Sequence, residues 1–484
     1  MNKSHKTSTH SALKAGIWYT ISNFIVKAIT FLTMPVFTRL MSAEDIGTFS
    51  NISSWFSILA IVTTFELYSS VTIARFKYQK DLDSYISSNL FLGSIITLLC
   101  YIIVLIFNPF FQKIFNMNLI SIHIIFLYLL VYPSIQMFYV KNRINYNYKP
   151  IIIVSLGSSI ISCTVSLVCV LTMKNALLGR ILGNYVPFII FSSFIYIYLM
   201  YQGKSISPKY WKYSLIVSFP LIWHLLAGNL LNSSDKIMIT KYLGANANAM
   251  YSIAYTCSMI VSLLWTSMNS AWSPWAFEMM EQKKYKELKK KSKPYFIFFL
   301  MIAILFMLFA PEILLIMGGQ TYLEATYVIP PVMLGYIFQF VYSLYINIEY
   351  YHKRQKYIAI GTVLAALINI LLNAVFIPLF GYIAAAYTTL IGYIFLFIIH
   401  YSIVKKMGYS HWYDIKFFMK WLVLMSLFMI LLSILYKYTM LRIILISLFI
   451  LFISFLVIKN KMILMEALKE KSFQPILTKI KRRI

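Results

Sequence analysis

Apolar runs long enough to cross a lipid bilayer recur from one end of this chain to the other. The hydrocarbon core of a membrane takes about 20 helical residues, and the 484-residue sequence is 60% hydrophobic and only 12% charged. A segment in hydrocarbon must satisfy its own backbone hydrogen bonds, which a helix does internally. The runs are continuous and do not alternate, which disfavours a β-barrel. We therefore expect an all-α integral membrane protein.

The apolar runs predict about fourteen transmembrane helices. Their expected ranges are 12–38, 48–73, 85–107, 119–140, 150–173, 177–200, 213–242, 247–276, 294–317, 326–350, 357–378, 382–404, 417–437 and 440–458.

The distribution of positive charge supports this number of helices. If the chain starts in the cytoplasm, 34 of the 43 Lys and Arg residues fall in cytoplasmic segments, and six fall on the opposite side. Cytoplasmic loops carry such an excess, so we expect an even helix number and both termini in the cytoplasm. Topology thus explains the net charge of +28. Membrane lipids, and no nucleic acid, are the expected partners.

An internal repeat is visible when the chain is shifted by 202 residues. Thr38 then meets Thr240, and Ser50 meets Ser252, each within a similar helix exit. A six-helix repeat predicts two lobes in a pseudo-twofold arrangement about an axis along the membrane normal. The expected division is an N-terminal lobe at 1–207, a C-terminal lobe at 208–408, and two additional helices with a basic cytoplasmic tail at 409–484.

Motifs for catalysis are missing from the sequence. It contains no Walker A motif, no His-Glu-x-x-His and no nucleophile elbow. The seven histidines do not cluster, and the four cysteines lie inside apolar runs without metal-ligand spacing. We therefore expect no catalytic residues, no metal site and no cofactor. A membrane transporter, driven by an ion gradient or by its substrate's own gradient, fits better than an enzyme.

Three cations lie within the expected helices. Placing Lys27 in hydrocarbon costs about 3 kcal/mol, which an anionic ligand, a wet cavity or a buried ion pair can offset. Arg180 and Lys236 lie nearer helix ends, where snorkelling is the alternative. Asp235 and Lys236 point about 100° apart on their helix. The residues around Asp235 are polar, and Asn229 lies a turn and a half before it. This polar face favours a cavity lining around Asp235.

The candidate site residues form two sets. The substrate-binding set is Lys27, Arg180, Lys236 and Asn229. The coupling or cavity-shaping set is Glu66, Asp235 and His224: Glu66 as the partner of Lys27 or a proton carrier, and His224 as a proton relay or a satisfied buried histidine. Asn229 is the counterpart of Lys27 under the 202-residue shift, so the two lobes are not equivalent in charge.

Several segments resemble Wzx-type O-antigen flippases, in the polysaccharide transporter branch of the multidrug/oligosaccharidyl-lipid/polysaccharide superfamily. The first helix and its exit carry YTISNF at 19–24, KAITFLT at 27–33, PVFTRL at 35–40 and DIG at 45–47. The seventh helix and the start of the eighth carry DKIMI at 235–239, YLG at 242–244 and YSIAY at 251–255.

The resemblance implies a twelve-plus-two helix protein of the bacterial inner membrane. It implies a flippase that moves undecaprenyl-diphosphate-linked oligosaccharide, such as an O-antigen repeat unit, to the periplasmic leaflet by alternating access. It further implies a coupling cation or proton and contacts with polysaccharide polymerase machinery. The carrier diphosphate would give Lys27 an anionic partner.

Two alternatives remain. A multidrug/cation antiporter of the same superfamily would prefer acidic residues in its cavity, whereas here a lysine occupies the centre. A membrane glycosyltransferase or polymerase of the same pathway would need a catalytic motif or a large outside loop, and the expected outside loops are short.

Overall fold

The computed structural model describes residues 2–459, and all regular elements in that range are helices. The first half contains α1 (Asn2–Leu40), α2 (Ala43–Thr64), α3 (Leu67–Lys77), α4 (Leu82–Ile106), α5 (Asn108–Phe115), α6 (Leu119–Ile144), α7 (Tyr148–Thr172) and α8 (Ala176–Gly203). The second half contains α9 (Pro208–Leu243), α10 (Ala245–Glu281), α11 (Tyr285–Leu308), α12 (Ala310–Gly318), η1 (Gln320–Val328), α13 (Ile329–Tyr351), α14 (Gln355–Phe380), α15 (Ile383–Lys406), η2 (Ser410–Trp412), α16 (Ile415–Leu435) and α17 (Thr439–Lys459). The expected basic tail beyond residue 459 lies outside the described residues.

Fourteen helices within residues 2–459 are long and apolar enough to cross a membrane, which confirms the predicted number. The main differences are breaks. The expected helix at 48–73 is split into α2 and α3 by Phe65 and Glu66, whose φ angles are 51° and 50°. Two left-handed non-glycine residues cannot continue a right-handed helix. The expected helix at 294–317 is split into α11 and α12 just before Pro311, whose ring does not fit a helix interior.

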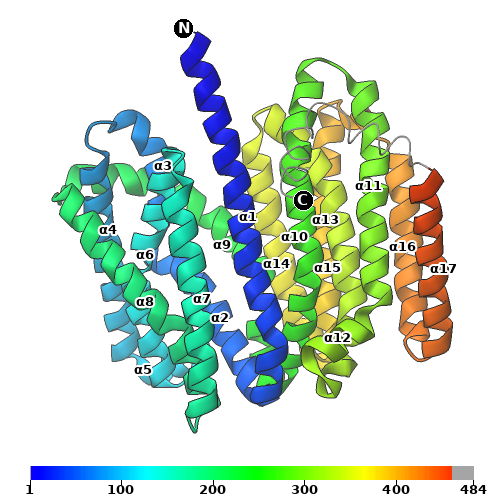
Figure 1. The fold of residues 1–484 in the computed structure, drawn as a ribbon, viewed down its shortest axis with the longest axis horizontal. Coiled ribbons are helices and arrows are strands. Elements are labelled where there is room, and N and C mark those ends of the chain that lie inside the picture. Colours follow the sequence, from blue (N-terminus) through cyan, green and yellow to red (C-terminus); the bar gives the residue numbers. More distant parts are fainter. Residues whose placement is uncertain (1, 460–484) are drawn as a thin grey trace, which may run out of the picture.

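The helices form two bundles with α1 and α9 between them (Figure 1). In the first bundle, α8 packs against α4, α6 and α7. In the second bundle, α15 packs against α13 and α14, and α16 and α17 lie along the outer edge beside α11. α9 contacts both bundles, through α2 and α14.

The two ends of the molecule differ in charge. The connections after α3, α6, α8, α10, α13 and α15 lie at the end where α1 begins, and they and the helix ends beside them are rich in Lys and Arg. We call this the basic end and the opposite one the far end. Helix α1 therefore runs from the basic end to the far end.

The bundles approach most closely where α2 crosses α10 near the far end. A Cβ atom on Gly47 would lie 1.8 Å from the backbone oxygen of Ala245, so only glycine fits there. The Asn248 amide donates to the Gly47 backbone oxygen at 2.8 Å. The hydroxyls of Ser50 and Ser252 share a hydrogen bond at 2.6 Å. These two serines are the pair that the 202-residue shift superimposes.

The outermost helices are attached to the second bundle by polar contacts at both ends. At the far end, Arg442 forms a bidentate pair with Glu312, with both N–O distances at 2.5 Å. At the basic end, Lys293 lies 2.7 Å from Asp414 and donates to it. This contact lowers the pKa of the Asp414 carboxyl below its usual value. α16 and α17 are thus held to the bundle and not free in the bilayer.

A fully buried acid–base pair joins α13 to α15. Glu349 Oε1 lies 2.8 Å from His400 Nδ1, and both side chains are 0% exposed. The other carboxylate oxygen of Glu349 and Nε2 of His400 have no partner within the described residues. Each group therefore depends on the other for its only side-chain hydrogen bond.

Replacing His400 with Ala should destabilise the protein by about 3–5 kcal/mol, because it leaves the Glu349 carboxyl buried without its donor. The measurement is thermal or denaturant unfolding of the detergent-solubilised protein. The double variant Glu349→Leu with His400→Leu should recover much of the loss, since it removes both polar groups. A His400→Ala protein as stable as wild type would contradict the role of this pair.

Candidate functional site

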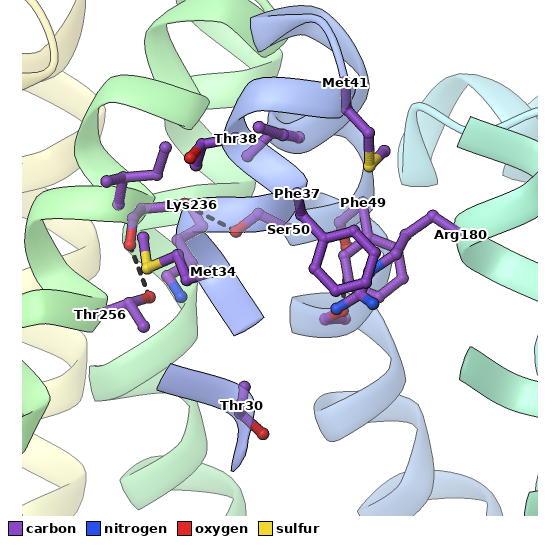
Figure 2. Close-up of a pocket in the computed structure, with 14 residues that line it drawn as sticks. Thr30, Met34, Phe37, Thr38, Met41, Phe49, Ser50, Arg180, Lys236 and Thr256 are labelled. Atoms are coloured by element: carbon purple, nitrogen blue, oxygen red, sulfur yellow. Dashed lines mark hydrogen bonds between the residues drawn. The ribbon is translucent and has the colours of Figure 1, made fainter. Parts of the chain in front are cut away.

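A cavity of about 260 Å³ lies among helices α1, α2, α8, α9 and α10 in the far-end half of the protein (Figure 2). Two cations, Arg180 and Lys236, line it from opposite sides, and none of its lining residues is acidic. Cations in a low-dielectric site attract an anion much more strongly than they do in water. The lining residues are Thr30, Met34, Phe37, Thr38, Met41, Ile46, Phe49, Ser50, Ser53, Arg180, Lys236, Ser252, Ile253 and Thr256.

The Arg180 guanidinium is held by aromatic rings. Its central carbon lies 3.5 Å from the ring centroid of Phe37 and 4.9 Å from that of Phe49 (Figure 2). Such stacking uses the faces of the guanidinium plane and leaves its N–H groups at the edge. Within residues 2–459, Arg180 has no ion pair, so these donors are available to a ligand in the cavity.

A second cavity of about 270 Å³ adjoins the first and shares Arg180 with it. Thr30, Phe49 and Ser53 also line both spaces. The second cavity is rich in hydroxyl and amide groups, from Thr33, Ser159, Ser162 and Asn184. Arg180 can therefore contact a ligand in either cavity. The hydroxyl and amide groups nearby offer neutral hydrogen-bonding partners to the same ligand.

Asp235 and Lys236 are neighbours on α9 but face two different environments. Lys236 is half-buried, lines the first cavity, and places its Nζ 5.4 Å from the ring centroid of Tyr255. Asp235 is only 1% exposed and hydrogen-bonds to residues inside the second bundle. Lys236 therefore faces the cavity, and within residues 2–459 it forms no ion pair with Asp235.

Asp235 accepts three hydrogen bonds inside the second bundle. The Tyr251 hydroxyl donates to Oδ2 at 2.5 Å, and the Thr389 hydroxyl donates to the same atom at 2.7 Å. The Asn373 amide donates to Oδ1 at 2.6 Å. Asn369 extends the network by donating to Thr389. Three donors offset much of the energetic penalty of burying a carboxylate.

This Asp235 network is the best-formed candidate for a coupling ion. It offers one carboxylate together with the side-chain oxygens of Asn369, Asn373, Thr388 and Thr389, all of which are buried. Oxygen ligands suit a hard cation, and the carboxylate alone suits a proton. Across the described residues, no group of three or more His, Cys, Asp or Glu side chains has the geometry for a metal.

Lys27 is exposed on α1 and lies outside the lining of both cavities. It is seven residues before Met34, so the two side chains share a helix face and are about 10 Å apart along the axis. Lys27 is thus placed nearer the basic end, on the face that leads to the cavity. The ion pair with Glu66, one of the two alternatives for that residue, is not found among the described residues.

Asn229 and His224 lie on α9, outside the lining of the two cavities. The Asn229 amide donates to the backbone oxygen of Leu225 at 3.1 Å. His224 is half-buried, and its Nδ1 has no hydrogen-bond partner in the described part of the chain.

Glu66 stabilises the break between α2 and α3. It is 5% exposed, and its carboxylate accepts hydrogen bonds from Tyr68 at 2.6 Å and Ser69 at 3.1 Å. The Ser218 hydroxyl of α9 donates to the Glu66 backbone oxygen at 3.3 Å. The sequence did not predict the break, because the Ser218 partner of the Glu66 backbone oxygen lies 152 residues away on another helix.

Contacts between α1 and α12 lie on the far-end side of the cavity. The Thr38 hydroxyl donates to the Met317 backbone oxygen at 2.7 Å, and Arg39 donates to the Ile316 oxygen at 3.1 Å. Both acceptors belong to the last turn of α12, where free carbonyl groups favour a cation. With the α2–α10 crossing, these contacts join the two bundles at the far end.

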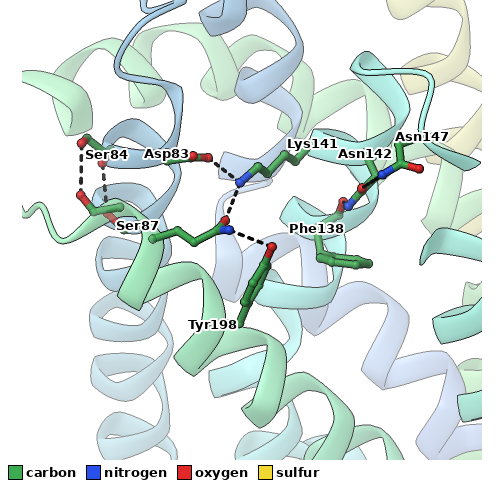
Figure 3. Close-up of polar contacts among 10 residues, drawn as sticks. Asp83, Ser84, Ser87, Phe138, Lys141, Asn142, Asn147 and Tyr198 are labelled. Atoms are coloured by element: carbon green, nitrogen blue, oxygen red, sulfur yellow. Dashed lines mark hydrogen bonds and ion pairs between the residues drawn. The ribbon is translucent and has the colours of Figure 1, made fainter. Parts of the chain in front are cut away.

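Polar contacts near the basic end include a network within the first bundle (Figure 3). Lys141 of α6 lies 2.5 Å from Asp83 and donates to Gln202 of α8 at 2.6 Å. Gln202 in turn donates to the Tyr198 hydroxyl at 2.7 Å. These contacts tie α4, α6 and α8 into one unit.

The sequence did not identify several residues of the site. Asn369 and Asn373 are four residues apart inside an apolar helix, and this spacing placed two amides on one face. The sequence therefore did contain a signal for Asn369 and Asn373. No such signal marked Phe37 and Phe49, because aromatic residues are abundant throughout the chain.

Comparisons with known proteins agree with this architecture. The sequence profile of the family described as "Polysaccharide biosynthesis protein" matches residues 12–280, and the MatE profile matches residues 220–375. The uncharacterized membrane protein MJ1068 of Methanocaldococcus jannaschii is 26% identical over 432 residues, which cover 82% of this chain and 84% of that protein. Lsg locus putative protein 1 of Haemophilus influenzae is 21% identical over 380 residues, covering 74% and 89%.

Solved structures show the same fold. The lipid II flippase MurJ in an inward closed conformation has a TM-score of 0.65 at 17% identity, covering 93% of this chain and all of that one. An inward-facing multidrug resistance MATE family transporter has a TM-score of 0.61 at 15% identity, covering 82% and 98%. The profile match extends over more than half of the chain. This chain therefore belongs to the family described as "Polysaccharide biosynthesis protein" and is a multi-pass membrane protein.

Proposed function

We propose that this protein is a transporter, a flippase for undecaprenyl-diphosphate-linked oligosaccharide, such as an O-antigen or related surface polysaccharide repeat unit. The observation that carries the proposal is the cavity with Arg180 and Lys236 and no acidic lining residue. A diphosphate is an anion that a guanidinium can bind through two parallel hydrogen bonds. A cationic drug would be repelled by the same cavity, which disfavours the antiporter alternative.

Lys27 extends this cationic path toward the basic end. It lies on the face of α1 that continues to Thr30 and Met34, both of which line the cavity. We assign it the first contact with the diphosphate, before the group reaches Arg180 and Lys236. Asn229, Glu66 and His224 then shape the space around this path.

The transport cycle would rock the two lobes, residues 1–207 and 208–408, about the α2–α10 crossing. The basic end faces the cytoplasm in this proposal, as the positive-inside rule requires, and the membrane is the bacterial inner membrane. A cation or proton at Asp235 would bias the second lobe, since a change of charge there alters three buried hydrogen bonds. Contacts with polysaccharide polymerase machinery would form at the periplasmic surface.

The test is translocation in proteoliposomes that contain a fluorescent undecaprenyl-diphosphate-linked oligosaccharide. We expect wild-type protein to move the probe between leaflets, faster with an imposed proton or sodium gradient than without one. Lys27→Ala should slow translocation about tenfold, because one charge-assisted contact is lost. Lys27→Arg, which keeps the charge, should retain most of the rate. No translocation by wild type would overturn the proposal, and an unimpaired Lys27→Ala would overturn the role of Lys27.

A further inference from the structure

A third pocket, of about 530 Å³, lies between α10 and α13 in the basic-end half of the second bundle. It is lined by Asn269, Ser273, Phe277, Asn347, Tyr350 and Tyr351, and no charged residue contributes. Its volume lies within the range of small-molecule sites. The pocket is separate from the first cavity, lined by Arg180 and Lys236, which we call the cation cavity. Ser273 is 17 residues beyond Thr256 on α10, about 25 Å nearer the basic end.

Three polar side chains meet in this pocket. The Ser273 hydroxyl lies 3.2 Å from Asn347 Oδ1 and 3.3 Å from Asn269 Oδ1, so it can donate to either amide. Asn347 is 4% exposed, and its Nδ2 has no hydrogen-bond partner within residues 2–459. An amide nitrogen carries two N–H donors, and burying them unpaired costs about 1–3 kcal/mol. A ligand that accepts hydrogen bonds would remove this penalty.

Aromatic rings form the rest of the wall. Tyr350 and Tyr351 are 44% and 36% exposed, although they lie next to a buried helix face. Tyr351 is kept in place by an edge-to-face contact with His352, at 5.1 Å between ring centroids. Neutral amides, a hydroxyl and exposed ring faces together recognise a polyhydroxylated ring, whose hydroxyl groups accept and donate while its C–H face packs on an aromatic ring.

We propose that this pocket is a glycan subsite, which binds a pyranose ring of the lipid-linked substrate on the loading side. The inference rests on the flippase function proposed above and adds a second contact for the same molecule. A distance of about 25 Å from the cation cavity suits a sugar remote from the diphosphate. The pocket then selects for the oligosaccharide, and the cation cavity binds the carrier phosphate that all such substrates share.

The test compares the affinity of purified full-length protein in nanodiscs for two probes. One is sugar-free undecaprenyl diphosphate, and the other is an undecaprenyl-diphosphate-linked pentasaccharide of hexoses and N-acetylhexosamines. Wild type should bind the pentasaccharide lipid about tenfold more tightly. Asn347→Leu, similar in size but without the amide, should remove this preference and leave the affinity for the sugar-free lipid unchanged. Tyr350→Ala, at an exposed position, provides a second variant in case Asn347→Leu does not fold.

Ser270→Ala is the matched control, because Ser270 is an exposed α10 residue whose hydroxyl donates to the Thr266 backbone oxygen at 2.8 Å, outside the pocket. It should keep the wild-type preference. Equal wild-type affinity for the two probes, or a preference that survives both pocket variants, would overturn the glycan subsite while the flippase proposal stands. If wild type binds neither probe, the proposed function fails and this inference falls with it.

Discussion

Replacing Arg180 and Lys236 together by Gln should abolish the binding of undecaprenyl diphosphate and its translocation. Each cation offers charge-assisted hydrogen bonds to the diphosphate, worth about 2 kcal/mol, so each single variant should lose about 30-fold in affinity. The double variant should lose more than either, because no other cation lines the cavity. The measurements are the dissociation constant in nanodiscs and the initial rate in proteoliposomes.

Two further variants make this test specific. Arg180→Lys keeps the positive charge but loses the planar group that stacks between Phe37 and Phe49, so we expect an intermediate affinity. Lys174→Gln removes an exposed cation two residues before the start of α8, outside the cavity lining, and should bind as wild type does. Wild-type affinity in the Arg180/Lys236 double variant would show that the cavity does not hold the diphosphate.

Gly47→Ala should stop transport by forcing the two bundles apart at the far end. The added Cβ would lie 1.8 Å from the Ala245 backbone oxygen and 3.0 Å from the Ala249 nitrogen, and neither backbone atom can move without its helix. Overpacking of this kind costs about 1–3 kcal/mol or more. Separation would also break the Ser50–Ser252 hydrogen bond. We expect the translocation rate to fall at least 100-fold, which corresponds to a free-energy cost of about 2.7 kcal/mol for closing the far end.

Gly157→Ala is the matched control for this substitution. A Cβ at Gly157 of α7 meets nothing within 4 Å, so the same chemical change should leave transport at the wild-type rate. Labelling a Thr256→Cys variant from the far-end side, in a background without the four native cysteines, reports the opening directly, because Thr256 lines the cavity. The label should react faster when Gly47→Ala is added. An active Gly47→Ala protein with unchanged labelling would show that this crossing does not close the far end.

The membrane spans could be read from the sequence because the bilayer makes them a local property. Each span must be apolar over about 20 residues and must satisfy its own backbone, whatever its neighbours are. This is why the predicted number of spans agrees with the structure, although α1 and α11 begin at Asn2 and Tyr285, well before their expected starts at 12 and 294. The break at Glu66 is different, because its backbone oxygen accepts a hydrogen bond from Ser218 on another helix, 152 residues away.

The contact between the two bundles was only partly visible in the sequence. The 202-residue shift matched Ser50 with Ser252, and the structure brings their hydroxyls to 2.6 Å. The same shift gave no indication that Gly47 would allow the closest approach of the bundles. A glycine has no side chain to match, and its role here is set by the Ala245 backbone oxygen on another helix.

The site shows most clearly what the sequence alone determines. It identified Arg180, Lys236 and Asp235 as costly intramembrane charges, because that cost depends only on residue type and depth. It also placed Asp235 and Lys236 on different helix faces, as helical geometry requires. Which side each faces was decided by tertiary structure alone. Asp235 points toward Asn373 and Thr389, which lie 138 and 154 residues away, while Lys236 points into the same cavity as Arg180. Contacts over such separations depend on how whole helices pack, which no local pattern encodes.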